Sequence, residues 1–532
     1  MKYFKIILLT GNEYFIPKRP KASPSGQPSL TKVGNEVREG LMKQIILYTS
    51  FCLLITASVG CKKYLDKEPD NRATVGTPEK VSQLLGTAYP QANYQSFAET
   101  MSDNVADIGS GGSDIVIRDP FYFADTKDNQ QDSPEFYWYA CYSAIAAANQ
   151  ALQTISKVGN PNDYSAQKGE ALVARAYAHF MLVNFFSKFY DEATAGSSPG
   201  IPYVTEPEIV FIKQYDRKTV QYVYEMVEKD LLEGIPLIED KVYNVPKYHF
   251  NKAAAYAFAA RFYLFKKDYA KVIEYANLVI PGNNFAANLR GWNTTYKNIT
   301  DVTELFKIYA RATENANLLL VETSSLWSRN YYTSRYGVDD NKQSQIFPRP
   351  DPLTGGNFAF SLYSFGTDHK LIPKIDEYFV KVSVNAEIGI PYVMVPLFTV
   401  EEVLFNRAEA YTYTNNYAAA IADLNTYAGT RILNYSASAH NITEARINSV
   451  FGTSNTRDGI IGAILYYKRA EFIHEGMRWF DILRYKLPVE HTTSPNASGA
   501  VTVLATLSAD DPRKVLQIPQ STSLAGLQPN PR

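Results

Sequence analysis

The sequence is poor in cysteine, histidine and net charge, and each shortage excludes a class of function. Only 3 Cys and 6 His occur in 532 residues, and they form no dense cluster of the kind that binds a transition metal. The 53 basic side chains nearly balance the 54 acidic ones, so the formal charge is −1. A nucleic-acid binder needs a basic surface that neutralises phosphates. We therefore expect no metal, no cofactor and no nucleic-acid partner.

Signatures of catalysis are missing as well. His474-Glu475 lacks the second histidine of a zinc-protease H-E-x-x-H motif, because Arg478 and Trp479 follow. No G-x-S-x-G motif stands in a strand-to-helix setting, and the glycines at 109–112 lack the following Lys-Ser/Thr of a phosphate loop. No pair among the 54 acidic residues stands out as the acid and base of a glycosidase. These absences indicate that the protein is not an enzyme.

An apolar run near the N-terminus predicts export and lipidation. The run from Ile45 to Val59 follows a lysine and is too short to span a bilayer comfortably. Gly60-Cys61 comes directly after it, which is typical of a bacterial lipobox, although Ser58 stands where leucine is usual. We therefore predict that the Cys61 thiol is lipidated. Several acyl chains on Cys61 would give a stable anchor, since a single chain binds a membrane only marginally.

This motif divides the chain. We interpret residues 42–60 as a lipoprotein signal peptide, 61–77 as a lipidated polar tether, and the proline-rich residues 1–41 as a mis-called start. Cys141 is then the single cysteine left in the mature body, so no intramolecular disulfide can form there. We expect the fold to be held by its hydrophobic core, for which the chain is long enough.

Part of the body repeats at an offset of 148 positions. Ala260, Tyr263 and Tyr269 recur as Ala408, Tyr411 and Tyr417, each set spanning a helix, a tight polar turn and a second helix. A looser third copy of the first helix lies at 174–177. The units are similar to degenerate tetratricopeptide repeats, which stack in pairs around a shared core. We predict an all-α, tetratricopeptide-like superhelix with long irregular loops and a minor β-hairpin near residues 357–363.

Four segments match a known family in order and spacing. They are Lys63-Tyr64-Leu65-Asp66 after the lipobox, the helix Gly169–Tyr177 followed by Gly200-Ile201-Pro202-Tyr203, the segment Lys468–Arg484, and a tail with Ile518-Pro519 and Gln528-Pro529-Asn530-Pro531. From Cys61 to Arg532 the chain resembles the SusD/RagB family of nutrient-binding outer-membrane lipoproteins of Bacteroidota.

The resemblance implies a lipoprotein of the cell outer membrane, facing the exterior, that caps a SusC-like TonB-dependent transporter. Residues 78–532 would form an α-helical ligand-binding domain, with an N-terminal part at about 78–280 and a C-terminal part at about 281–532. Lys62-Lys63 departs from the acidic residues that often follow the lipidated cysteine in members displayed at the surface. The implied ligand is an oligosaccharide, delivered without catalysis. A peptide ligand, an exported hydrolase and a tetratricopeptide scaffold without a small ligand stay open as alternatives.

Aromatic side chains are the predicted ligand contacts. The chain has 39 Tyr and 28 Phe, and sugars lay their C–H faces on such rings while nearby polar side chains bond their hydroxyls. The irregular insertion 281–370 is too long to be a simple connector, and long loops are often functional. The resemblance implies contacts in this insertion and in the first loop region. The candidates are Trp292, Tyr296, Trp327, Tyr331 and Tyr332 in the insertion, and Tyr94, Phe97 and Asn104 in the first loop region.

Two further patterns give structural predictions. Asp103, Asp107 and Asp114 surround the glycines at 109–112 and could ligate calcium through oxygen, but they lack EF-hand spacing, so we interpret the segment as a solvated loop. Residues 468–484 have the pattern of a single helix, in which Glu471, Glu475 and Arg478 share one face at the spacing of ion-pairing side chains.

Overall fold

The predicted helical repeats are present as antiparallel helix pairs. The computed structural model describes residues 76–208, 213–366 and 368–532, so Cys61, the segments 1–41 and 42–60, and all but the end of the tether lie outside the described residues. The helices are α3 (Pro78–Leu85), α4 (Gln95–Thr100), α5 (Ile115–Phe121), α6 (Pro134–Lys157), α7 (Ser165–Phe186), α8 (Val220–Gly234), α9 (Lys252–Lys266), α10 (Tyr269–Val279), α11 (Val302–Tyr309), α12 (Trp327–Thr333), α13 (Asp340–Ile346), α14 (Val400–Tyr413), α15 (Tyr417–Arg431), α16 (Ala437–His440), α17 (Glu444–Phe451), α18 (Thr456–Glu471) and α19 (Met477–Arg484).

The two copies of the repeat share the geometry of their turns. α9 packs on α10 in the first copy, and α14 packs on α15 in the second. Lys267 and Asn415, 148 positions apart, are both left-handed, with φ of 64° and 60°. The next residue in each turn, Asp268 or Asn416, caps the second helix by accepting a hydrogen bond from a backbone N–H of its first turn. The helix–turn–helix repeat is confirmed.

Buried arginines link the helices within a pair. α7, which contains the third copy, is buried along almost its whole length and packs against both α6 and α8. Arg175 of α7 makes a forked ion pair with Asp230 of α8, at 2.7 and 2.8 Å. Arg407 of α14 and Asp423 of α15 repeat this geometry at 2.9 and 2.6 Å. Forked pairs of this kind fix the relative orientation of two helices as well as their distance.

The stacked helix pairs confirm the predicted all-α, tetratricopeptide-like fold.

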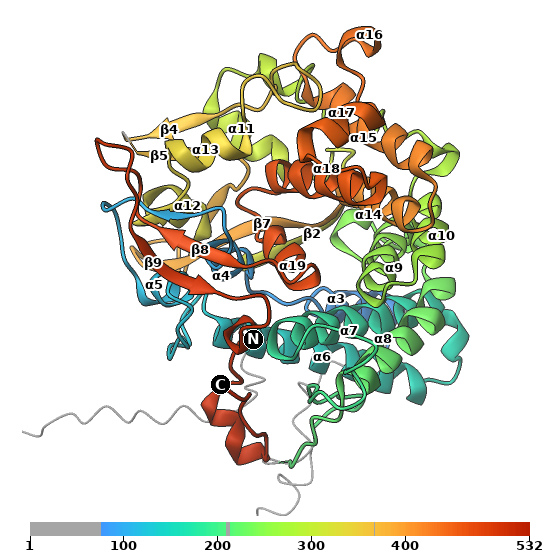
Figure 1. Ribbon diagram of the computed structural model, residues 1–532. Helices are drawn as coiled ribbons and strands as arrows, with labels where there is room; N and C mark the ends of the chain where they lie inside the picture. The colour runs from blue at the N-terminus through green and yellow to red at the C-terminus, as the bar shows by residue number, and fades with distance from the viewer. Residues whose placement is uncertain (1–75, 209–212, 367) are drawn as a thin grey trace, which may run out of the picture. The chain divides into compact units, whose positions relative to one another are not determined.

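Small antiparallel sheets accompany the helices. In Figure 1, β4, β5, β8 and β9 lie to the left, while the pairs α9–α10 and α14–α15 lie to the right. A three-stranded sheet in the order β2-β7-β6 was not predicted, because the apolar run of β2 lies in the insertion that we expected to be irregular. The strands are β1 (Ala106–Asp107), β2 (Asn317–Ser324), β3 (Tyr336–Gly337), β4 (Tyr363–Phe365), β5 (His369–Leu371), β6 (Glu377–Lys381), β7 (Gly389–Thr399), β8 (Val489–Thr492) and β9 (Val503–Leu507).

The β-hairpin lies later in the chain than we predicted. The predicted position at 357–363 is wrong, because Phe358 bridges Ile432, just after α15. The hairpin consists instead of β4 and β5, with Tyr363 opposite Leu371. Its turn contains Gly366 at φ 62°, a conformation that glycine adopts without steric cost.

The segment 468–484 is two helices and not one. α18 ends at Glu471 and α19 begins at Met477, and His474 and Gly476 between them have φ of 71° and 70°. A left-handed backbone cannot continue a right-handed helix. The predicted pairing of Glu471, Glu475 and Arg478 on one helical face is therefore wrong, and each pairs with another part of the chain.

A chain of fully buried charges ties the insertion to the second helix pair. Arg290 contacts Glu401 of α14 at 2.9 Å, Glu401 contacts Arg431 of α15 at 2.9 Å, and Arg431 contacts Glu471 of α18 at 2.8 Å. All four side chains have no solvent exposure. Buried charges survive only when each has a partner, so the network fixes how these elements meet. In the part of the chain that is described, no helix is long and apolar enough to cross a membrane.

Candidate ligand-binding surface

A two-residue ladder joins the two regions in which we predicted ligand contacts. Ala106 and Asp107 of β1 pair with Gly337 and Tyr336 of β3, so the first loop region lies against the central insertion. The exposed glycine-rich loop after β1 continues this contact, because the backbone N–H of Gly112 donates to the Thr333 carbonyl at 3.0 Å. Segments more than 200 residues apart in the chain thus form one surface.

Half-exposed aromatic rings lie on this surface. We call Tyr122, Tyr332, Arg335 and Phe365 the aromatic surface. Tyr122, which follows α5, is 37% exposed, and Phe365 of β4 is 50% exposed. The Tyr332 ring at the end of α12 is partly exposed and meets Phe365 edge-on, with ring centroids 4.9 Å apart. Tyr122 packs edge-on against the buried Tyr336 at 6.0 Å.

An arginine–aspartate pair supplies the polar part of the aromatic surface. Nε and Nη2 of Arg335 donate to the two carboxylate oxygens of Asp107 at 2.7 and 2.9 Å. Asp107 also accepts the backbone N–H of Gly109 at 2.8 Å, which holds the glycine-rich loop in place. The Arg335 side chain remains 42% exposed, and its hydrogen bonds to Asp107 raise its pKa. Partial burial and the neighbouring Tyr336 raise the pKa of Tyr122, so its hydroxyl stays protonated at neutral pH.

This arrangement suits a flat, hydroxylated ligand. Exposed rings offer apolar platforms, and a guanidinium held by a carboxylate presents its remaining N–H donors in a fixed orientation. Tyr332 and Arg335 are three residues apart, so about 10 Å at most separates their backbones.

Seven of the eight predicted ligand contacts lie inside the structure. Only Tyr332 is more than 3% exposed. Contact of the other seven with a ligand stays a prediction from the sequence, and in this conformation they are buried core side chains. Trp327, for example, donates its indole N–H to the His474 carbonyl at 2.8 Å. The seven buried side chains are Trp292, Tyr296, Trp327, Tyr331, Tyr94, Phe97 and Asn104.

The three aspartates around the glycine-rich loop do not converge. Asp103 makes a forked ion pair with Arg478 at 2.8 and 2.9 Å, and Asp107 pairs with Arg335. Burial opposes ionisation of Asp103, but the arginines beside it prevail and lower its pKa. Asp114 is exposed at the start of α5. Among the described residues, no group of three or more His, Cys, Asp or Glu side chains could hold a metal ion.

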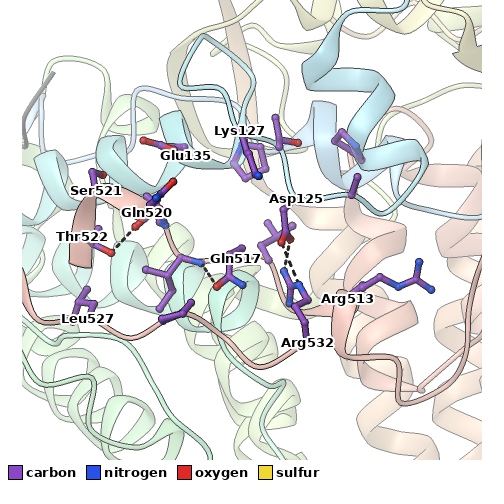
Figure 2. A pocket seen from close by; sticks show the side chains of 18 of the residues that line it. Asp125, Lys127, Glu135, Arg513, Gln517, Gln520, Ser521, Thr522, Leu527 and Arg532 are labelled. Carbon is purple, nitrogen blue, oxygen red and sulfur yellow. Dashed lines mark hydrogen bonds and ion pairs between the residues drawn. The ribbon is translucent and has the colours of Figure 1, made fainter. Parts of the chain in front are cut away.

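A cavity of about 590 Å³ lies on the other side of the segment that follows α5. Phe123, left-handed at φ 54°, lines this cavity, whereas its neighbour Tyr122 belongs to the aromatic surface. Figure 2 shows Asp125 and Arg532 joined by an ion pair in the wall. The tail motif that we matched in the sequence forms part of this wall through Ile518, Pro519 and Pro529. Its Asn530 holds the tail in place by donating to the Phe186 carbonyl at 2.9 Å.

Sequence reasoning missed three residues of the aromatic surface. Arg335 contacts Gly112 of the glycine-rich loop and Phe365 packs on the predicted Tyr332, but distant segments set the exposure of all three residues. Phe365 was missed because it lies in the β4–β5 hairpin, and the hairpin predicted from the sequence lies earlier in the chain. One signal for Tyr122 was its position: it directly follows α5, the short helix that begins just after the glycine cluster of the first loop region.

Two family models match this chain. A family described as "Starch-binding associating with outer membrane" matches residues 63–264, and the SusD family matches residues 395–520. "SusD-like protein P38" of Formosa agariphila is 22% identical over 83% of this chain and 92% of its own length. "SusD-like protein P2" of the same organism is 24% identical, but the match spans only 45% of that protein.

Solved structures share the fold at low identity. A SusD superfamily protein from Bacteroides thetaiotaomicron superposes with a TM-score of 0.63 at 19% identity, covering 86% of this chain and all of that one. A SusD-like carbohydrate-binding protein from Bacteroides vulgatus gives 0.60 at 16% identity, covering 85% and 96% of the two chains. A laminarin-binding SusD-like protein gives 0.53 at 17% identity, covering 85% and 97%.

Proposed function

Because the chain belongs to the SusD/RagB family, we propose that it is an outer-membrane lipoprotein that binds an oligosaccharide and delivers it to a SusC-like TonB-dependent transporter without catalysis. The matched family is described by starch binding and association with the outer membrane, and two of the structural neighbours are described as carbohydrate-binding or laminarin-binding. Delivery to the transporter, the orientation towards the cell exterior and the absence of catalysis are parts of the proposal.

The aromatic surface is the observation that carries this proposal. Tyr122, Tyr332 and Phe365 reach solvent, and Tyr122 packs on Tyr336, the neighbour of Arg335 in the forked Arg335–Asp107 pair. Oligosaccharides present alternating apolar faces and hydroxyls along their length, which such rings and N–H donors match. The rings come from three separate elements, so the surface exists only in the folded chain.

The cavity beside the tail fits an oligosaccharide less well. Its wall contains the Asp125–Arg532 ion pair, and its apolar lining comes from aliphatic and proline side chains with Phe123 as the one ring. A sugar chain there would find a single stacking platform. We therefore assign ligand capture to the aromatic surface.

Delivery would follow the thermodynamics of a hinged lid. A ligand favours the closed state of the lipoprotein over the transporter only so far as it binds that state more tightly than the open one. Anchoring through the lipidated Cys61 would keep the lipoprotein beside the transporter. No chemical step on the ligand is needed for this cycle.

A double variant tests the proposal. We expect Tyr122→Ala with Tyr332→Ala to weaken retention in gels that contain a bound polysaccharide by about tenfold or more, because each lost stacking platform removes roughly 1 kcal/mol. Tyr222→Ala is the matched control, because Tyr222 of α8 is also 37% exposed but lies on a helix of the repeats. Thermal unfolding checks that both variants remain folded.

Three results would contradict the proposal. Unchanged retention of the double variant would remove the aromatic surface as the binding site. Release of sugar products from any polysaccharide would show catalysis. Retention by peptides and by no glycan would replace the oligosaccharide with the peptide ligand that the sequence left open.

A further inference from the structure

Carboxylates neutralise Arg335 of the aromatic surface and two further exposed arginines, Arg329 and Arg118. Arg335 is held by Asp107, and Arg329 of α12 donates to Glu377 of β6 at 2.8 Å. Arg118 of α5 is paired with the adjacent Asp119 at 2.9 Å. These arginine side chains are 42%, 50% and 47% exposed, respectively, so they can reach a ligand, but none presents an uncompensated charge.

Further acidic groups add to this balance. Asp114, at the edge of the glycine-rich loop, and Asp368, in the turn between β4 and β5, are both exposed. Lys370 of β5, mostly buried, contacts Asp340 at 3.0 Å. The four basic and six acidic side chains named in this and the preceding paragraph give a net charge of 4 − 6 = −2.

The forked pair has no net charge, yet it leaves N–H donors of Arg335 for a ligand. An arginine has five N–H donors. Asp107 accepts the single N–H of Nε and one N–H of Nη2, so three donors remain. The remaining donors can bond sugar hydroxyls, which do not displace a carboxylate. A carboxylate or sulfate bound to the same remaining donors would meet the negative charge of Asp107 at short range, on a guanidinium that Asp107 already neutralises.

We infer that the aromatic surface selects uncharged oligosaccharides over uronate-rich or sulfated ones, and that Asp107 sets this preference by neutralising Arg335. This inference rests on the proposed function, because it names the class of ligand for the same surface. It assigns Asp107 a role in specificity, in addition to holding the loop through Gly109.

Gel retention with two sets of polysaccharides tests the inference at 0.15 M salt. The neutral set is laminarin, mannan, xyloglucan and starch, and the anionic set is alginate, homogalacturonan and carrageenan. We expect the unmodified protein to be retained by at least one neutral polysaccharide and by none of the anionic ones. Asp107→Asn should gain about tenfold in retention by an anionic polysaccharide, because it frees the Arg335 fork while the amide oxygen can still accept the Gly109 N–H.

Asp511→Asn is the matched control. Asp511 holds Arg513 in a forked pair at 3.0 and 2.8 Å and, like Asp107, accepts a backbone N–H two residues on, but it lies beside the tail cavity. Both substitutions remove one negative charge and free one arginine. An equal gain in the two variants would overturn the role of Asp107, because it would reflect net charge alone.

The remaining outcomes distinguish a failure of this inference from a failure of the proposed function. Stronger retention of the unmodified protein by an anionic than by any neutral polysaccharide overturns the inference and leaves oligosaccharide binding intact. This measurement needs no variant, so it decides the preference even if Asp107→Asn unfolds. Retention by neither set overturns the proposed function, and the inference falls with it.

Discussion

The carboxylate of Glu99 and the backbone N–H of Gly476, 377 positions apart in the chain, form a hydrogen bond of 3.0 Å in the core. The other oxygen of the same carboxylate accepts the His474 N–H, also at 3.0 Å. These amides belong to the break between α18 and α19, where no helical carbonyl can reach them. Glu99 of α4 therefore supplies the acceptors that the broken helix lacks.

Removing this carboxylate should destabilise the protein. We expect Glu99→Ala to lower the free energy of unfolding by about 3 kcal/mol, because it leaves two buried N–H groups without an acceptor. Urea unfolding followed by circular dichroism measures the change. Glu192→Ala, at an exposed position, should change the free energy by less than about 0.5 kcal/mol. Equal effects for the two variants would disprove the role of Glu99.

The buried charge network gives a second stability prediction. Arg431→Met should cost about 3–5 kcal/mol, because it leaves Glu401 and Glu471 buried without their shared cation. Arg329→Met breaks an ion pair whose arginine is half exposed, so it should cost about 1 kcal/mol or less. Chemical denaturation of both variants compares the two costs. A loss below about 1 kcal/mol for Arg431→Met would mean that the network does not hold the insertion in place.

A buried aspartate predicts a pH dependence of stability. Burial raises the pKa of Asp132 to about 7, against the hydrogen bonds from the Ser325 hydroxyl at 2.6 Å and the Leu326 N–H at 2.8 Å. Between the ordinary aspartate pKa near 4 and pH 7, the folded protein keeps this proton while the unfolded chain has lost it. The folded state then binds more protons, so the contribution of Asp132 to stability falls as pH rises through this window.

A difference measurement isolates this contribution. The free energy of unfolding of the unmodified protein minus that of Asp132→Asn should fall between pH 5 and pH 7, by up to about 1.4 kcal/mol per pH unit. Asp163→Asn, at an exposed position, serves as the control for the loss of one carboxylate. A flat difference for Asp132→Asn would show that Asp132 titrates normally.

The glycine-rich loop offers a test that adds a single methyl group. Gly111 has φ of 99°, and a Cβ there would overlap the Thr333 carbonyl and lie 2.9 Å from the Arg335 nitrogen. We expect Gly111→Ala to displace the loop from the aromatic surface, costing about 1 kcal/mol or more and lowering glycan affinity by about tenfold. Gly112→Ala is the matched control, because nothing lies within 4 Å of its added Cβ. Equal glycan affinity in the two variants would show that the position of the glycine-rich loop does not affect glycan binding.

The proposed lipidation of Cys61 predicts where the protein is found. Cys61→Ser should move it from the membrane fraction to the soluble periplasmic fraction, because the acyl chains supply the apolar contacts with the bilayer. Fractionation and metabolic labelling with a radioactive fatty acid measure both effects. Cys52→Ser, inside the predicted signal peptide, should leave the labelling unchanged. Membrane association that persists after Cys61→Ser would point to another anchor.

The sequence was most informative where structure depends on neighbours along the chain. The repeat at an offset of 148 predicted both helix pairs, because helical periodicity and turns such as Lys267-Asp268 are local properties. Local reasoning failed at 472–476, because that segment has the pattern of a helix. The acceptors that stabilise its break come from Glu99, and no pattern within the segment shows them.

The sequence by itself predicted the helical repeats, the resemblance to the SusD/RagB family and two regions for ligand contacts, and the structure brought these two regions together. Only the tertiary structure decided which rings reach solvent there. Trp327 and Tyr332 lie on the same short helix, yet one is buried under the His474 backbone and the other is partly exposed beside Phe365. Exposure depends on which distant segments cover a side chain, and neither the residue nor its neighbours in sequence contain that information.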